Sequence, residues 1–196
     1  GVSSQSASTN EDASRAITVS ATDADGDALT YTVLSSASNG TTSVSGGTVT
    51  YTPRLNYNGT DSFVVTASDG KGGTATQTVN VTVSAVNDPP TFSASSQSVS
   101  ATAGTAKTIT LAATDVDGDT LTYTVATPGK GTAIISGSTL TYTPTLNLTG
   151  ADSFTFRVKD PSLTSSVATV SIVITNVNDV PVATAQTVTT DEDTAK

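Results

Sequence analysis

Apolar and polar residues alternate along most of this chain with a period of two. Stretches such as "LTYTV" at 29–33 and "TVNVTV" at 78–83 put every second side chain on one face, which is the pattern of a half-buried β-strand. Threonine and valine supply much of the alternation, and both suit a pleated surface. No stretch has a convincing helical period. The pattern therefore predicts an all-β protein.

In the first half of the chain the alternation predicts seven short strands. They are expected near 3–8 and at 16–22, 28–34, 41–45, 48–52, 62–68 and 74–85. The same alternation assigns the faces, because successive side chains of a strand point to opposite sides. Val49 and Tyr51 share an inward face, as do Phe63, Val65 and Ala67. This is the strand number of an immunoglobulin-like β-sandwich.

Internal repetition is the strongest signal in the sequence. "TDADGDALTYTV" at 22–33 returns as "TDVDGDTLTYTV" at 114–125. "AVNDPP" returns as "NVNDVP", and "YTPRLNYNGTDSF" as "YTPTLNLTGADSF". We therefore expect two complete repeats, at 1–88 and 89–181, and the first strand of a truncated third repeat at 182–196. The predicted fold is two tandem seven-stranded Greek-key β-sandwiches arranged head to tail.

Charge and composition exclude several classes of function. The formal net charge is −9 and the isoelectric point is near 4.1, so a phosphate backbone would be repelled and nucleic-acid binding is not expected. No apolar run approaches the roughly 18 residues of a membrane span. The chain has no cysteine, which rules out disulfides. It also has no histidine, and without a nucleophile–base pair we do not expect an enzyme.

The positions of the acidic residues are the main clue to chemistry. All 17 lie in motifs that occur at least twice. In an immunoglobulin-like sandwich the second and sixth inter-strand loops lie at one end, which should bring together Asp23, Asp25, Asp27 and Asp69. The opposite end then carries Glu11, Asp61, Asn87 and Asp88.

Head-to-tail stacking would join the second end of repeat 1 to the first end of repeat 2. The residues expected at that junction are Glu11, Asn87, Asp88, Asp115, Asp117 and Asp160, with Asp61 and Asp119 nearby. Two carboxylates about 4 Å apart repel by about 1 kcal/mol in water and by about 4 kcal/mol at an effective dielectric constant of 20. Calcium takes about 6–8 oxygen ligands of the kinds on offer here. The sequence therefore predicts Ca²⁺ at the junction.

Some of these residues have a second interpretation. Asp, Asn and Gly are turn formers, and an isolated Asp-Gly pair is more often a turn than a metal site. Asp61 and Asp152 could bind backbone N–H groups in the loop before the sixth strand. Asp27 and Asp119 could cap the turn in place of binding metal. These alternatives stay open at the level of sequence.

The motifs resemble those of cadherin repeats. "ATDADGD" at 21–27, "ASDGKGG" at 67–73 and "VNDPPTF" at 86–92 are similar to the cadherin calcium segments and linker, and Glu11 stands where that family has a glutamate. The motif sequences are more similar still to the tandem cadherin-like repeats of large bacterial surface and secreted proteins, including RTX-type adhesins. That resemblance covers about residues 1–182 and implies calcium between successive domains.

The second repeat departs from the cadherin pattern. Ala103 stands in place of Glu11, and the sixth loop reads "KDPSLTS". Asn178 and Asp179 remain, but the third repeat is truncated, so the end of repeat 2 is short of ligands. The first end of repeat 1, with Asp23, Asp25 and Asp69, would be a half-site that lacks the ligands of a preceding repeat.

The resemblance implies a calcium-rigidified spacer or stalk of an adhesin. The expected location is extracellular, secreted or on the cell surface, in a Gram-negative bacterium. The expected partners are neighbouring repeats of the same chain, with a monomer as the solution state, no nucleic acid and no membrane insertion. The alternative is a calcium-dependent module that binds cell-surface carbohydrate or another copy of the adhesin. Tyr57 is the one tyrosine expected in a loop, where a sugar could stack.

Overall fold

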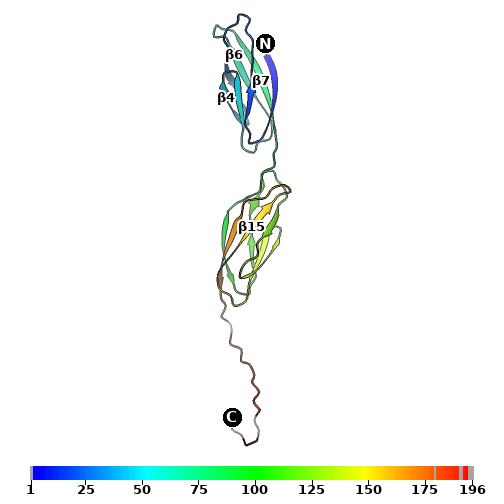
Figure 1. The fold of residues 1–196 in the computed structure, drawn as a ribbon, viewed down its shortest axis with the longest axis vertical. Coiled ribbons are helices and arrows are strands. Elements are labelled where there is room, and N and C mark those ends of the chain that lie inside the picture. Colours follow the sequence, from blue (N-terminus) through cyan, green and yellow to red (C-terminus); the bar gives the residue numbers. More distant parts are fainter. Residues whose placement is uncertain (1, 179, 190–191, 194–196) are drawn as a thin grey trace. The chain divides into compact units, whose positions relative to one another are not determined.

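The computed structural model describes residues 2–178, 180–189 and 192–193. The chain divides into two compact units, Gly1–Asp88 and Pro89–Lys196, which we call unit 1 and unit 2. Both are built from β-strands (Figure 1). Residues 182–189, where a further opening strand was expected, form no strand. In unit 1 the strand Val2–Asn10 pairs with the last strand, Thr74–Ser84, and in unit 2 the strand Ser96–Thr102 pairs with the last strand, Ala168–Thr175.

Unit 1 contains seven strands in two sheets. They are β1 (Val2–Asn10), β2 (Arg15–Thr18), β3 (Thr30–Ser35), β4 (Gly40–Ser45), β5 (Thr48–Pro53), β6 (Gly59–Ser68) and β7 (Thr74–Ser84). One sheet has the order β1-β7-β6-β3 and the other β2-β5-β4. Strand β1 runs parallel to β7, and the other pairs are antiparallel.

Unit 2 repeats this arrangement and adds one short ladder. Its strands are β8 (Thr91–Phe92), β9 (Ser96–Thr102), β10 (Lys107–Thr110), β11 (Ala113–Thr114), β12 (Thr122–Val125), β13 (Gly131–Ser136), β14 (Thr139–Pro144), β15 (Gly150–Lys159) and β16 (Ala168–Thr175). The two main sheets have the orders β12-β15-β16-β9 and β10-β14-β13, and β11 pairs with β8. The predicted fold, two tandem immunoglobulin/cadherin-like β-sandwiches, is confirmed.

Each core lies between the two sheets of its own unit. In unit 1, Val49 and Tyr51 of β5 are fully buried against Phe63 and Val65 of β6. The rings of Tyr51 and Phe63 are stacked with their centroids 6.2 Å apart, and Tyr142 and Phe154 repeat this pair in unit 2 at 5.9 Å. The alternation of the sequence therefore assigns the inward faces of these strands correctly.

Some strand boundaries differ from the prediction, and the start of β6, like that of its counterpart β15, moves a candidate residue. Strand β2 ends at Thr18, so a long loop at 19–29 leads to β3. Strand β6 begins at Gly59 and β15 at Gly150. Asp61 and Asp152 are consequently strand residues, although the sequence placed them in a loop. A glycine with positive φ starts each of these strands (131° at Gly59 and 91° at Gly150), a conformation that side chains disfavour.

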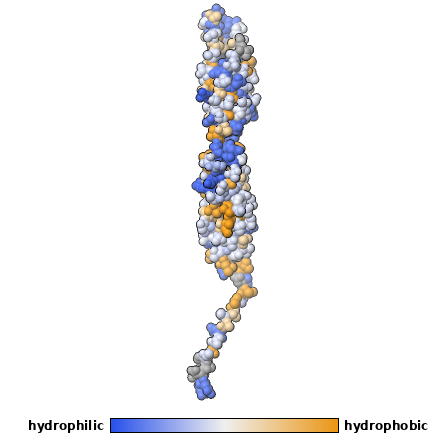
Figure 2. Space-filling model, turned by 90° about the vertical axis from the view of Figure 1, so that its right-hand side faces the viewer, coloured by the Kyte–Doolittle hydropathy of each residue, from blue (hydrophilic) through white to orange (hydrophobic). Residues whose placement is uncertain are grey.

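The surface carries mostly small polar side chains. Figure 2 shows a face on which intermediate hydropathy predominates, with strongly hydrophilic and strongly hydrophobic areas between. Threonine, which makes up 41 of 196 residues, occupies many of the outward strand positions. Within the described residues, no helix is long and apolar enough to cross a membrane.

Candidate metal-binding loops

In the loop between β2 and β3, the backbones of two aspartates donate hydrogen bonds to the carboxylate of a third. Asp23 Oδ1 accepts hydrogen bonds from the backbone N–H groups of Asp25 (2.9 Å) and Asp27 (3.1 Å). Gly26 makes the tight turn between them with a φ of +77°. The carboxylate oxygens of these three residues include a set within 4.8 Å of one another, so the triad could hold a metal ion.

The loop between β6 and β7 lies beside this triad. Asp69 and Asp23 line one cavity of about 210 Å³ in unit 1. Asp69 Oδ1 accepts hydrogen bonds from Lys71 N (2.7 Å) and Gly73 N (2.9 Å), which closes the loop on itself. Lys71 Nζ lies 2.7 Å from Asp27 Oδ1. The structure thus brings Asp23, Asp27 and Asp69 to one end of the sandwich and adds a lysine that the sequence analysis did not consider.

Unit 2 folds its corresponding loop in the same way. Asp115 Oδ1 accepts hydrogen bonds from Asp117 N (3.0 Å) and Asp119 N (3.2 Å). Asp160, after β15, is buried, and its Oδ1 accepts from the backbone N–H groups of Ser162 and Leu163. Burial raises the pKa of Asp119, and the charges of Asp115, Asp160 and Asp117 raise it further. The carboxylate of Asp119 is therefore repelled by the other three, and we call these four residues the unit 2 cluster. Among the described residues, three carboxylate oxygens within 4.8 Å of one another occur in the triad of unit 1 and not in this cluster.

One oxygen of this second cluster has no compensation. Asp115 Oδ2 is buried and has no hydrogen-bond partner in the described part of the chain. A buried carboxylate oxygen without a partner is costly, and a cation is the simplest group that would relieve both this oxygen and the repulsion around it. The residues of this cluster are therefore suited to bind a metal ion.

At the other end of unit 1, a buried glutamate holds the outgoing chain. Glu11 is 4% exposed, and its Oε1 accepts a hydrogen bond of 2.6 Å from Val86 N. The next residues are Asn87 and Asp88, both half-buried, and Asn87 Nδ2 donates to the Asp88 carbonyl at 3.2 Å. Glu11 thereby fixes the segment that carries these two candidate ligands.

Unit 2 lacks this device. Ala103 N donates to Thr175 O at 2.9 Å, as Glu11 N donates to Ser84 O at 2.9 Å, so Ala103 does occupy the position of Glu11. Ala103 offers no carboxylate to the following segment, where Asn178 is exposed. Asp179 lies outside the described residues.

Asp61 and Asp152 are each surrounded by hydrogen-bond donors of their own unit. Asp61 accepts backbone hydrogen bonds from Ser38 (3.0 Å), Asn39 (2.8 Å) and Ser62 (2.9 Å), and one from the Tyr51 hydroxyl (2.9 Å). Burial tends to raise the pKa of Asp61, but these four donors together lower it below 3.8. Both carboxylate oxygens are already used, which favours the alternative in which Asp61 binds backbone N–H groups. The N–H groups belong mainly to the β3–β4 connection and not to the loop before β6.

Asp152 in unit 2 has the equivalent set of donors. They are Gly129 N, Lys130 N, Ser153 N and the Tyr142 hydroxyl. The sequence did contain a signal for this pair, because Tyr and Asp recur ten positions apart, as Tyr51 and Asp61 and again as Tyr142 and Asp152. The alternation by itself predicts only that each tyrosine lies in the core.

These features define a tandem β-sandwich protein with an acidic loop cluster at one end of each sandwich. The family model described as bacterial Ig domain matches twice, at residues 2–82 and 87–173. The chain belongs to this family. Bacterial Ig domains are typical of surface and secreted bacterial proteins and are typically non-catalytic.

One curated protein is similar in sequence, and two solved structures are similar in fold. Integrin beta-like protein E of Dictyostelium discoideum is 27% identical, and the match covers 74% of this chain but 9% of that protein. Drosophila N-cadherin EC1-4 is 20% identical with a TM-score of 0.56, over 88% of this chain and 49% of that one. Human protocadherin-24 EC1-2 is 18% identical with a TM-score of 0.51, over 88% and 94% respectively. The cadherin likeness confirms the resemblance at the level of architecture.

Proposed function

We propose that this chain is a calcium-binding structural repeat module of a bacterial extracellular protein. The observation that carries the proposal is the carboxylate cluster of unit 2, in which Asp115 Oδ2 is buried without a hydrogen bond while Asp117, Asp119 and Asp160 add like charges around it. The matching triad of unit 1, with its oxygens within 4.8 Å, supports the same chemistry.

The available ligands favour calcium over other metals. Both clusters offer only carboxylate and backbone oxygens, whereas zinc prefers histidine and cysteine. Magnesium keeps more of its water and accepts fewer protein oxygens. In unit 2 the proposed ligands are Asp115, Asp117 and Asp160, with Asp119 as a further oxygen. In unit 1 Asp23, Asp25 and Asp69 correspond to them.

We further propose that the linker contributes ligands to the cluster of unit 2. The support is the order of the chain, since Asn87 and Asp88 directly precede unit 2, and the hydrogen bond from Val86 N to Glu11, which positions the start of that linker. A shared ion would restrict the linker and stiffen a spacer or stalk, whose partners are the neighbouring repeats of the same chain. We place this module on the surface of, or outside, a Gram-negative cell.

A module that binds carbohydrate or another copy of the adhesin is the second candidate, and one observation speaks against its expected platform. Tyr57 is half-buried and packs against the core of unit 1, and its hydroxyl donates to Thr60 O at 2.6 Å. A sugar-stacking ring needs an open face. We therefore favour the structural role and do not propose catalysis.

Small-angle X-ray scattering with and without a chelator tests the role in the linker. We expect the full chain to give a narrow, extended distance distribution in millimolar calcium and a broader one after chelation, because shared ligation removes linker freedom. Superimposable profiles would contradict a calcium-stiffened linker. Replacing both Asp115 and Asp117 by alanine should remove the difference between the two conditions.

Lys71 should weaken calcium binding in unit 1. Its ammonium group lies 2.7 Å from Asp27 Oδ1, and the lysine side chain is 70% exposed. Such an exposed pair contributes about 0–1 kcal/mol to stability, so Lys71→Ala should leave the unfolding free energy nearly unchanged. The same substitution should tighten calcium binding to unit 1 several-fold, because a competing positive charge is removed. Calorimetric titration of both proteins measures this, and unchanged affinity would contradict it.

A further inference from the structure

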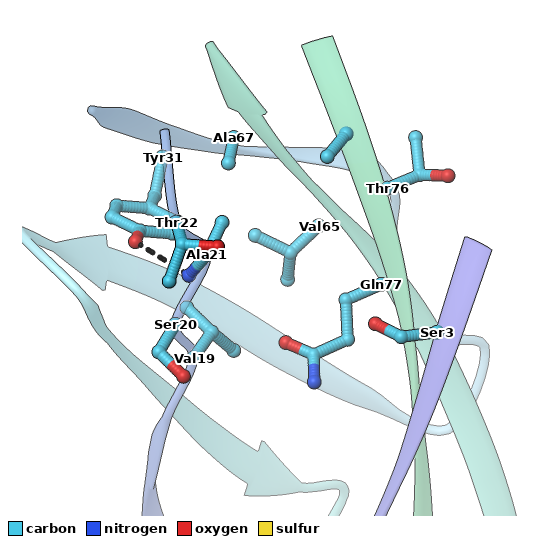
Figure 3. A pocket seen from close by; sticks show the side chains of 11 residues that line it. Ser3, Val19, Ser20, Ala21, Thr22, Tyr31, Val65, Ala67, Thr76 and Gln77 are labelled. Atoms are coloured by element: carbon cyan, nitrogen blue, oxygen red, sulfur yellow. Dashed lines mark hydrogen bonds between the residues drawn. The ribbon is translucent and has the colours of Figure 1, made fainter. Parts of the chain in front are cut away.

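Unit 1 contains an open groove that unit 2 does not share in the same form. The groove is a cavity of about 200 Å³ at the edge of the sandwich. Figure 3 shows Val65, Ala67 and Tyr31 at its base, with Gln77 and Ser3 along its rim. Residues 19–22, which follow β2, and Ala75 and Thr76 of β7 complete its lining. The base is apolar, whereas hydroxyl and amide side chains line the rim, so the groove suits a ring that enters with its edge on the base and leaves its backbone among polar groups.

In unit 2 the corresponding place is filled by a phenylalanine from the chain that precedes the sandwich. Strand β8 pairs with β11, with Phe92 opposite Ala113. The ring of Phe92 meets that of Phe156 edge to face at a centroid distance of 4.8 Å and packs on the core of unit 2. Ser93 N also donates to Ala112 O at 3.3 Å.

The register of the repeats identifies the equivalent positions. Phe156 pairs with Val125 as Val65 pairs with Val33, so Val65 is the counterpart of Phe156. Ala113 and Thr114 correspond to residues 21–22 in the repeated motif. Those counterparts in unit 1 line the groove and form no strand. Unit 1 therefore has the wall and floor of the Phe92 site but not the ring.

We propose that the groove of unit 1 is a docking site for the aromatic residue of a Pro-x-Phe segment joined directly to β1. The ring would occupy the place that Phe92 takes in unit 2, and the backbone of the segment would pair with residues 20–22. An apolar cavity of about 150 Å³ is known to hold a benzene ring, so the size is adequate. Unit 1 has the smaller Val65 where unit 2 has Phe156, and this difference makes the groove deeper.

The hydrogen bond inside the groove is compatible with such docking. Ala21 N donates to the Tyr31 hydroxyl at 3.1 Å (Figure 3). In unit 2 the hydrogen bond with the incoming segment is made one residue earlier, by Ala112 O. The counterpart of Ala112 is Ser20, so the Tyr31 bond need not be broken. This inference does not depend on calcium.

An N-terminal extension of the full chain tests the proposal. Asp-Pro-Pro-Thr-Trp placed before residue 1 reproduces the spacing of residues 88–92, because Ser3 of β1 corresponds to Ser95. The chain has no tryptophan of its own, so the added ring alone reports its surroundings. We expect a blue-shifted emission and weaker acrylamide quenching than for the free pentapeptide. An extension with Phe should also raise the unfolding temperature of unit 1 by about 5 °C over one with Ala.

The controls separate the other outcomes. Ala75→Leu, which adds bulk to the lining of the groove, should return the emission to that of the free peptide. A ring that fluoresces as in the free peptide, together with equal unfolding temperatures for the Phe and Ala extensions, would overturn the proposal. A blue shift that disappears on dilution, with a dimer in sedimentation, would show docking into a second copy and would overturn the same-chain placement.

Discussion

Replacing Asp61 by alanine is expected to lower the unfolding free energy of unit 1 by about 3 kcal/mol. The substitution leaves Ser38 N, Asn39 N and the Tyr51 hydroxyl without their acceptor, and each buried donor that loses its partner costs about 1–3 kcal/mol. Tyr51 is fully buried, so its hydroxyl has no access to water. Native-state hydrogen exchange measures this free energy for each unit separately.

Unit 2 provides the internal control for this substitution. Asp152 holds the same network there, so Asp61→Ala should destabilise the amides of β6 and β7 and leave those of β15 and β16 unchanged. Asp152→Ala should give the reverse result. Equal protection of unit 1 with and without Asp61 would show that the network contributes nothing to stability.

Acid should weaken both units through these two carboxylates. Burial alone would raise the pKa of Asp152, but the Tyr142 hydroxyl and three backbone N–H groups lower it below 3.8, as happens for Asp61. A pKa that is lower in the folded state means that the stabilisation is complete above the unfolded pKa and is lost as pH falls through the folded value. Stability followed by circular dichroism should therefore drop below about pH 4. Replacing both residues by asparagine should flatten that drop.

The fold could be predicted because the alternation, the repeat and the turn motifs all point to one architecture. Val49, Tyr51 and Phe63 lie in the core as their spacing required. The convergence of Asp23 and Asp69 on one cavity also followed from sequence, since it depends only on which loops share an end of the sandwich.

Features that depend on side-chain direction could not be predicted in the same way. The strand was expected to begin at 62, so the sequence placed Asp61 in a loop. Because the strand begins earlier, Asp61 lies within the pleated strand, which directs its carboxylate at the β3–β4 connection. Lys71 reaches Asp27 across two loops, and the second repeat has Ser162 at the position of Lys71. The position of Glu11 near the segment that leaves unit 1 could be predicted, but the hydrogen bond that it accepts from Val86 could not.

The groove of unit 1 was also invisible in the sequence. Comparing the repeats shows Val65 where unit 2 has Phe156, but an exchange of one apolar residue for another reads as ordinary core variation. Its meaning depends on Phe92, which the motif at 86–92 places in the linker but which packs on the core of unit 2 in the structure. A linker residue that completes a core is recognised only from packing.

Calcium is expected to stabilise unit 2 by about 1.4–2.7 kcal/mol at about 10 mM free ion, given that extracellular calcium modules bind at about 10⁻⁴–10⁻³ M. The physical reason is that the ion gives Asp115 Oδ2 the partner that it lacks and removes the repulsion that raises the pKa of Asp119. Magnesium at the same concentration should stabilise much less. Urea unfolding monitored by hydrogen exchange in β15 and β16 measures the effect.

The variant carrying Asp115→Ala and Asp117→Ala should lose this calcium dependence, because the proposed ligands are removed. In chelator, the loss of the acceptor for Asp117 N and Asp119 N opposes the relief of like-charge repulsion. The calcium response therefore distinguishes a metal site from a turn stabilised by aspartate alone, because such a turn would show no calcium response in either protein. Thr120→Ala, at an exposed neighbouring position, is the matched control and should keep the calcium response. Stabilisation by calcium that survives in the double variant would place the ion elsewhere on the chain.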